Sequence, residues 1–151
     1  MKGERTISIL MAEDDPDDQL LNQEAIEEAR LGDEIRFVSD GEELLDYLLQ
    51  RGKYSKPADA PRPDLIILDL NMPRMDGREA LAEIKKNPKL RRIPVVVLTT
   101  SRAEEDIVYT YSLGVSGYIT KPARFDEMVS AMKAVGRYWF ETVQLPPDEH
   151  S

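Results

Sequence analysis

The sequence predicts an α/β fold in which helices cover both faces of a doubly wound, five-stranded parallel sheet. Short apolar runs alternate along the chain with segments whose apolar residues recur at helical spacing. The runs at 65–68 and 95–98 are unbroken stretches of Leu, Ile and Val, as expected of strands buried on both faces. Strands that alternate with helices form right-handed βαβ units, and such units build a parallel sheet.

The apolar runs and the helical patterns place each element along the chain. We expect strands at 7–12, 35–38, 65–68, 95–98 and 118–119. We expect helices at 16 to about 32, 40–49, 77–86, 102–113 and 124 to about 143. Between the helix at 40–49 and the strand at 65–68, the segment 52–63 is rich in Lys, Pro and Ala and is predicted to form one surface loop.

The first helix has a clear start signal. Asp15 stands directly before Pro16, which is the pattern of an N-cap followed by proline at the first helical position. Helical spacing predicts that its buried face carries Leu20, Leu21, Ala25 and Ala29.

Length and composition predict one domain. A chain of 151 residues with 41% hydrophobic residues can bury a single core. We expect one domain over 1–151, with its core at about 7–137, a C-terminal helix extension and tail at 138–151, and no output domain. No apolar run approaches the roughly 20 residues of a membrane helix, and the first residues lack the apolar stretch of a signal peptide. We therefore expect no membrane partner.

Charge and residue usage exclude several kinds of function. The net charge of −9 disfavours binding to nucleic acid, whose phosphates are negative. The chain has no cysteine, so it forms no disulfide, which suits a cytoplasmic location. Its one histidine, His150, lies next to the last residue, which excludes most histidine-based catalysis.

Polar residues follow the predicted strands where each strand ends. Glu13 and Asp14 follow the first strand, Asp69 the third, Thr99 the fourth and Lys121 the fifth. Ligands of an open parallel sheet bind at the carboxyl ends of its strands. Carboxylates suit a hard cation such as Mg²⁺, and a lysine with a hydroxyl suits an anionic phosphoryl group. Together these groups predict a phosphoryl site.

Single residues near these strand ends also have purely structural interpretations. Asp15 fits a helix N-cap, Asp64 a turn residue, and Thr100 or Ser101 a cap for the fourth helix. The combination of complementary groups at four strand ends favours a site over coincidence.

At this point the motifs resemble those of the bacterial two-component receiver family. The resemblance covers 7 to about 137 and rests on four segments, 9–15, 68–77, 94–100 and 117–122. Its most specific part is the run Asp-x-x-Met-Pro-x-x-Asp-Gly that begins at Asp69, with Lys121-Pro122 fifty-two residues later. The resemblance implies the flavodoxin-like receiver fold with strand order 2-1-3-4-5.

The resemblance also implies roles for the acidic residues. Asp69 resembles the phosphoacceptor nucleophile, which forms an aspartyl phosphate. Asp14 resembles a direct Mg²⁺ ligand, and Glu13 a residue that acts on the metal through water. The main-chain carbonyl of Asn71 resembles a further ligand. The implied cofactor is Mg²⁺.

Further implied roles concern the response to phosphorylation. Thr99 resembles the switch hydroxyl that binds a phosphoryl oxygen, and Lys121 the lysine that pairs with the phosphoryl group. Pro122 is expected to follow a cis peptide bond, and Tyr118 occupies the position of the family's rotating aromatic residue. The implied function is a phosphoacceptor signalling protein, not an enzyme. It receives its phosphoryl group from a sensor histidine kinase, switches conformation, and promotes its own transfer and slow autodephosphorylation.

The C-terminal residues narrow the resemblance. The stand-alone length and the aromatic cluster Tyr138, Trp139 and Phe140 are similar to regulators paired with phytochrome-type histidine kinases. Aromatic residues in an apolar patch are typical of an interface. We therefore expect a homodimer that uses these three residues. The alternatives are that the cluster packs on the protein's own core or that it contacts the kinase.

Other classes of protein fit the sequence less well. A phosphatase of the haloacid-dehalogenase type needs a second aspartate two residues after the nucleophile, where this chain has Asn71. A flavin carrier of the same fold class needs a phosphate loop after the first strand, where this chain has three acids. A P-loop NTPase needs a Gly-x-x-x-x-Gly-Lys-Ser/Thr motif that is missing. A receiver that acts only as a scaffold would have lost some of the residues above.

Overall fold

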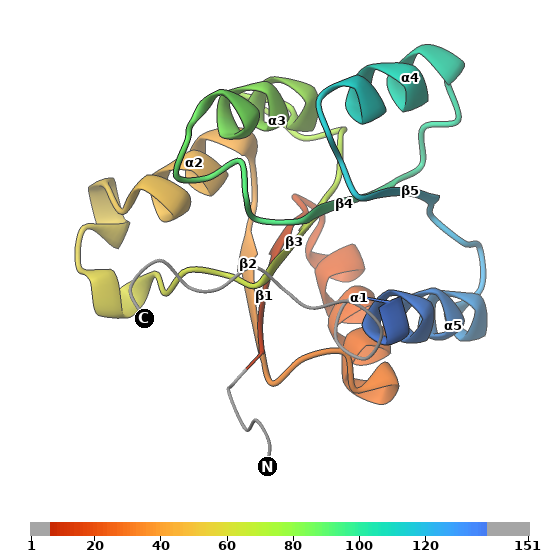
Figure 1. Cartoon of the computed structure of the whole chain (residues 1–151). Coiled ribbons are helices and arrows are strands. Elements are labelled where there is room, and N and C mark those ends of the chain that lie inside the picture. The colour runs from red at the N-terminus through yellow and green to blue at the C-terminus, as the bar shows by residue number, and fades with distance from the viewer. Residues whose placement is uncertain (1–6, 139–151) are drawn as a thin grey trace.

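The computed structural model describes residues 7–138, and it confirms the predicted sheet (Figure 1). The strands are β1 (Ser8–Ala12), β2 (Glu34–Val38), β3 (Leu65–Leu68), β4 (Val95–Thr99) and β5 (Gly117–Thr120). They are parallel and lie in the order β2-β1-β3-β4-β5. The order reverses between β1 and β3, and this switch point is where such sheets bind their ligands.

Five helices cover the two faces of the sheet. They are α1 (Pro16–Ala29), α2 (Gly41–Leu49), α3 (Gly77–Lys86), α4 (Glu104–Ser112) and α5 (Phe125–Gly136). Helices α1 and α5 lie side by side on one face, α2 and α3 cover the other, and α4 lies near β5 (Figure 1). The predicted loop at 52–63 contains two short 3₁₀ turns, η1 (Gly52–Tyr54) and η2 (Pro57–Asp59).

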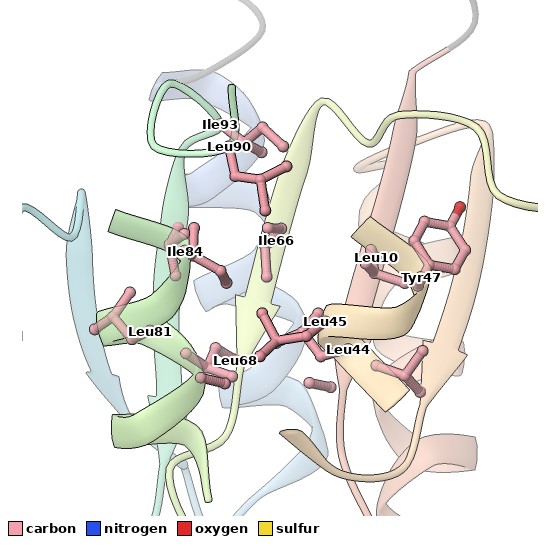
Figure 2. Packing of buried hydrophobic residues seen from close by; sticks show 14 of the residues in the cluster. Leu10, Leu44, Leu45, Tyr47, Ile66, Leu68, Leu81, Ile84, Leu90 and Ile93 are labelled. Atoms are coloured by element: carbon pink, nitrogen blue, oxygen red, sulfur yellow. The ribbon is translucent and has the colours of Figure 1, made fainter. Parts of the chain in front are cut away.

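The sheet separates two hydrophobic clusters. Successive strand residues point to opposite faces, so Ile66 and Leu68 join the cluster under α2 and α3, and Leu65 and Ile67 join the cluster under α1 and α5. Figure 2 shows the first cluster, in which leucines and isoleucines of α2 and α3 pack on β1 and β3. Burial on both faces explains why the runs of β3 and β4 are unbroken.

Helix α1 starts as predicted but buries a different face. The Asp15 carboxylate accepts hydrogen bonds from the backbone N–H of Asp17 at 2.8 Å and of Asp18 at 3.4 Å, which confirms the N-cap. The helix ends at Ala29, and Arg30 rather than a glycine takes the left-handed conformation after it.

The prediction that Leu20 and Leu21 lie on the buried face is wrong. They are 57% and 49% exposed, and the buried residues of α1 are Asn22, Ala25 and Ile26. These three occupy i, i+3 and i+4 positions that face the sheet and α5. Leu20 lies off this row. Leu21 borders an open groove beside the start of α5.

The bounds of two further helices differ from prediction. Helix α4 begins at Glu104 and ends at Ser112, one to two residues inside the expected range. Helix α5 runs from Phe125 to Gly136, and the part predicted beyond residue 138 lies outside the described residues. Within 7–138, no helix is long and apolar enough to cross a membrane.

The loop from β3 to α3 approaches the backbone of β3 very closely at Gly77. The Gly77 N–H donates to the Leu70 carbonyl at 2.9 Å. A Cβ atom at Gly77 would lie 2.3 Å from the Asp69 carbonyl oxygen and 2.7 Å from Leu70 Cα. Only glycine permits this approach, which holds the chain just after Asp69 against α3.

We predict that Gly77→Ala lowers the free energy of unfolding by about 1–3 kcal/mol through overpacking, although alanine favours helices over glycine. The control is Gly117→Ala, because a Cβ there meets its nearest atom at an ordinary 3.9 Å. Its effect should stay within about 1 kcal/mol. Urea unfolding measures both variants, and equal stabilities would contradict the close approach.

Candidate functional site

Three carboxylates meet at the carboxyl ends of β1 and β3. One oxygen from each of Glu13, Asp14 and Asp69 lies within 4.8 Å of the others. The parallel pairing of Ala12 with Leu68 places the residues that follow the two strands side by side. Glu13 and Asp69 are buried and Asp14 is exposed. The structure thus brings together the three acidic residues that the sequence predicts.

Lys121 extends from the end of β5 into this acidic cluster. Its Nζ donates to Glu13 Oε1 at 2.6 Å, to Asp69 Oδ2 at 3.2 Å and to Asp18 Oδ2 at 3.4 Å. The Lys121 N–H also donates to the Thr99 carbonyl at 2.7 Å, which continues the β4–β5 ladder and fixes the base of the side chain. The structure thus brings Lys121 together with Asp69.

Asp18 is a member of the cluster that the sequence alone does not reveal. From sequence it is an acid in the first turn of α1, where acids are common because they suit the helix dipole. Its position in the first turn of the helix that follows Glu13 and Asp14 is the one available signal. Its side chain is 42% exposed, so it forms the outer edge of the cluster.

Burial and charge shift the pKa values of the paired groups. Burial, aided by the charge of Asp69, raises the pKa of Glu13 although Lys121 and the Asp15 N–H counteract it. Burial alone would lower the pKa of Lys121, but Glu13 and Asp69 outweigh it and raise that pKa. Lys121 therefore stays charged at neutral pH, and one ammonium faces several carboxylates. A divalent cation suits this excess of negative oxygen ligands.

Thr99 and Asn71 border Asp69 on the other side. Thr99 is fully buried, and its Oγ1 accepts a hydrogen bond from Asn71 Nδ2 at 3.4 Å. The Asn71 N–H donates to Asp69 Oδ1 at 3.2 Å. The two oxygens of Asp69 thus have different partners, a backbone N–H on one and the Lys121 ammonium on the other.

Tyr118 lies outside the acidic cluster but is linked to it. The ring is half-buried, and its hydroxyl donates to the Ser101 carbonyl at 3.0 Å. The Ser101 N–H reaches Thr99 Oγ1 at 3.4 Å. Tyr118 therefore contacts the segment that follows Thr99 rather than Asp69 itself.

One predicted feature of the site is wrong. The peptide bond before Pro122 is trans, as are all peptide bonds in the described part of the chain. Trans is the more stable isomer even before proline, by about 0.5–1 kcal/mol. Lys121 reaches Glu13 and Asp69 with this trans bond.

The predicted dimer residues fall at the limit of the described chain. Tyr138 is 52% exposed. Trp139 and Phe140 lie outside the described residues.

Buried carboxylates with a lysine and a hydroxyl at the switch point of a 2-1-3-4-5 sheet define a phosphoacceptor class of protein, and comparisons with known proteins agree. The family model of the response regulator receiver domain matches residues 9–133. The chain is 44% identical to the response regulator Rcp1 of Synechocystis sp. over 138 residues, which are 91% of this chain and 92% of Rcp1.

Two solved structures are similar over nearly the whole chain. The phosphorylated cyanobacterial phytochrome response regulator RcpA has a TM-score of 0.86 and 46% identity, covering 95% of this chain and 100% of RcpA. The Mn²⁺-bound form of Rcp1 has a TM-score of 0.83 and 43% identity, covering 93% and 99%.

The chain belongs to the response regulator receiver domain family. It is a phosphoacceptor signalling protein similar to the response regulator Rcp1 and to the phytochrome response regulator RcpA, and nothing supports the alternative of a phosphatase.

We predict that Asp14→Ala weakens Mn²⁺ and Mg²⁺ binding by roughly tenfold or more. Substituting even a residue that only hydrogen-bonds to a metal ligand lowers metal affinity by roughly tenfold or more. Calorimetry measures the affinity. The matched control is Asp17→Ala, which removes an equal charge from an exposed residue outside the cluster. An equal loss of affinity in both variants would show a general charge effect and contradict ligation by Asp14.

Proposed function

We propose that this protein accepts a phosphoryl group from a sensor histidine kinase onto Asp69, with Mg²⁺ as cofactor, and relays the signal by switching conformation. The observation that carries the proposal is the environment of the Asp69 carboxylate. It is buried, one oxygen faces the Asn71 N–H, and the other faces the Lys121 ammonium. A carboxylate held in this way is an oriented nucleophile.

In the transfer step, residues of this chain position the phosphoryl group and neutralise the charge on its oxygens. An Asp69 oxygen attacks phosphorus, the new P–O bond forms, and the P–N bond to the kinase histidine breaks. Lys121 offsets charge on the phosphoryl oxygens, and the Thr99 hydroxyl donates to one of them. Asp14, Asp69 and the Asn71 carbonyl would hold Mg²⁺, with Glu13 acting through water, and the ion would supply further neutralisation. The same groups promote slow hydrolysis of the aspartyl phosphate.

The switch follows from the same contacts. Phosphorylation adds about 1.5 to 2 negative charges beside Lys121 and Thr99. Lys121 then exchanges carboxylate partners for phosphoryl oxygens, and Thr99 turns toward Asp69. Tyr118 responds because its hydroxyl is bound to Ser101, two residues after Thr99. This assigns the switch to Thr99, Tyr118 and Lys121.

A surface for the kinase lies directly beside the site. A groove between α1 and the start of α5 is lined by Leu21, Pro122, Phe125 and Met128, and also by Lys121. Leu21 and Phe125 are 49% and 42% exposed. Apolar side chains next to the nucleophile suit a helix of a partner that must bring its phosphohistidine there. The similarity to Rcp1 and RcpA supports a phytochrome-type kinase as that partner.

We also propose that the protein forms a homodimer through Tyr138, Trp139 and Phe140, and that it acts in the cytoplasm as a single receiver domain. The exposed Tyr138 ring supports the first point. The absence of cysteine is consistent with a reducing compartment.

We predict that Asp69→Asn abolishes incorporation of acyl phosphate from phosphoramidate in the presence of Mg²⁺, because an amide is a poor nucleophile. The fold should remain, since Lys121 keeps Glu13 as a partner. Radiolabel incorporation measures the effect, with Asp126→Asn on the exposed start of α5 as control. Incorporation at the wild-type rate in Asp69→Asn would refute the assignment.

We predict that Phe125→Ala slows transfer from the cognate phosphorylated kinase about fivefold or more, as expected for loss of an interface contact worth about 1 kcal/mol. Its phosphorylation by phosphoramidate should be unchanged. Leu49→Ala removes a comparably exposed side chain from α2 and serves as control. A parallel loss with both phosphodonors would place the defect in the site rather than in docking.

A further inference from the structure

Helix α4 begins without a side-chain cap. Its N-cap residue is Ala103, which offers no side-chain hydrogen bond to the helix. Instead Asp106 in the first turn accepts two hydrogen bonds from Arg78 of α3. Arg78 Nε donates to Oδ1 at 2.6 Å and Nη2 donates to Oδ2 at 2.6 Å. A bidentate pair of this kind fixes both distance and orientation, so α3 holds the start of α4.

The same carboxylate holds Ser101 in the loop between β4 and α4. Ser101 Oγ donates to Asp106 Oδ2 at 2.6 Å and accepts from the Ala103 N–H at 3.3 Å. The backbone of Ser101 then makes the two contacts described above, its N–H to Thr99 Oγ1 and its carbonyl to the Tyr118 hydroxyl. One chain of contacts therefore joins Arg78 to Thr99 and Tyr118.

Arg78 is itself held in place at the start of this series of contacts. Its Nη1 donates to the Leu70 carbonyl at 3.4 Å and to Asp76 Oδ2 at 3.4 Å. It is thereby tied to the loop that directly follows Asp69. The Asp106 side chain is 13% exposed and that of Arg78 is 29% exposed, so the carboxylate is largely shielded from competing water.

The charge state supports a persistent pair. Hydrogen bonds from Arg78 and Ser101 lower the pKa of Asp106 to about 2. The hydrogen bond and charge of Asp106 raise the pKa of Arg78 against the effect of burial. Both groups are therefore charged across the physiological pH range.

We propose that Arg78 is a positioning residue for the phosphorylation switch: through Asp106 it fixes Ser101, and Ser101 holds Thr99 and Tyr118 in the geometry that receives a phosphoryl group. The inference rests on the proposed function of Asp69. Without the pair, residues 99–103 lose an ordered arrangement. Binding of a phosphoryl group must then also order these residues, and the entropy lost in ordering them lowers the affinity.

The test uses beryllofluoride with Mg²⁺ as a phosphoryl mimic on the full chain. We expect Arg78→Gln and Asp106→Asn each to weaken beryllofluoride binding about tenfold, and their double variant to be no weaker than the worse single variant, because both remove one interaction. Arg78→Lys, which keeps the charge but not the fork, should restore only part of the affinity. Mg²⁺ affinity measured alone should stay at the wild-type value in all of them.

Two further measurements separate positioning from general stability. Arg124→Gln breaks an exposed ion pair with Asp126 at the start of α5 and should bind beryllofluoride like wild type. Ser101→Ala keeps the Arg78–Asp106 pair but removes the hydroxyl that joins it to the loop, so it should weaken binding as Arg78→Gln does. In NMR spectra, the amide shift of Thr99 on beryllofluoride binding should shrink in both variants.

Each opposite result has a defined meaning. If Arg78→Gln melts at a lower temperature but binds beryllofluoride as wild type does, its role is structural only and the proposal is wrong. Tighter binding by Arg78→Gln would show that the pair opposes the switch, which also overturns it. If the wild-type protein fails to bind beryllofluoride at all, the proposed function of Asp69 fails, and the role of Arg78 fails with it.

Discussion

The candidate site of this protein depends on one ammonium group, that of Lys121, held among carboxylates. Glu13 and Asp69 are buried side by side, and two buried negative charges are costly unless a positive group compensates them. Lys121 supplies that group, with Nζ at 2.6 Å from Glu13 and 3.2 Å from Asp69. Lys121 follows β5 and Glu13 follows β1, so the ion pairs exist only when every strand between them is in register.

The site therefore forms only when the sheet has its native strand order and register. The sheet order puts β3 between β1 and β4, and β5 next to β4. The residues just beyond β1, β3 and β5 enter the site, together with Thr99 at the end of β4. The apolar clusters on both faces hold the strands at fixed spacing. Gly77 adds a local constraint, since α3 lies against the backbone at Asp69. The outcome is a rigid frame that carries polar groups at one edge, with α4 linked to that edge through Arg78 and Ser101.

Much of this arrangement was predictable from sequence because its signals are local. An unbroken apolar run identifies a strand, and the next polar residue identifies what the strand presents, which located Glu13, Asp69, Thr99 and Lys121. Contacts between separate helices have no such signal. The Arg78–Asp106 pair joins residues that each look like ordinary surface charges. The same limit explains why the prediction that Leu20 and Leu21 are buried is wrong, because apolar spacing alone does not show where α5 stops covering α1.

The most direct test of the central claim is to locate the phosphoryl group itself. The protein is treated with phosphoramidate and Mg²⁺, the acyl phosphate is reduced with borohydride, and the modified residue is identified by tandem mass spectrometry. Reduction converts a phosphorylated aspartate to homoserine, so the account predicts homoserine at position 69 and only when Mg²⁺ is present. Homoserine at another aspartate, with residue 69 unmodified, would contradict it.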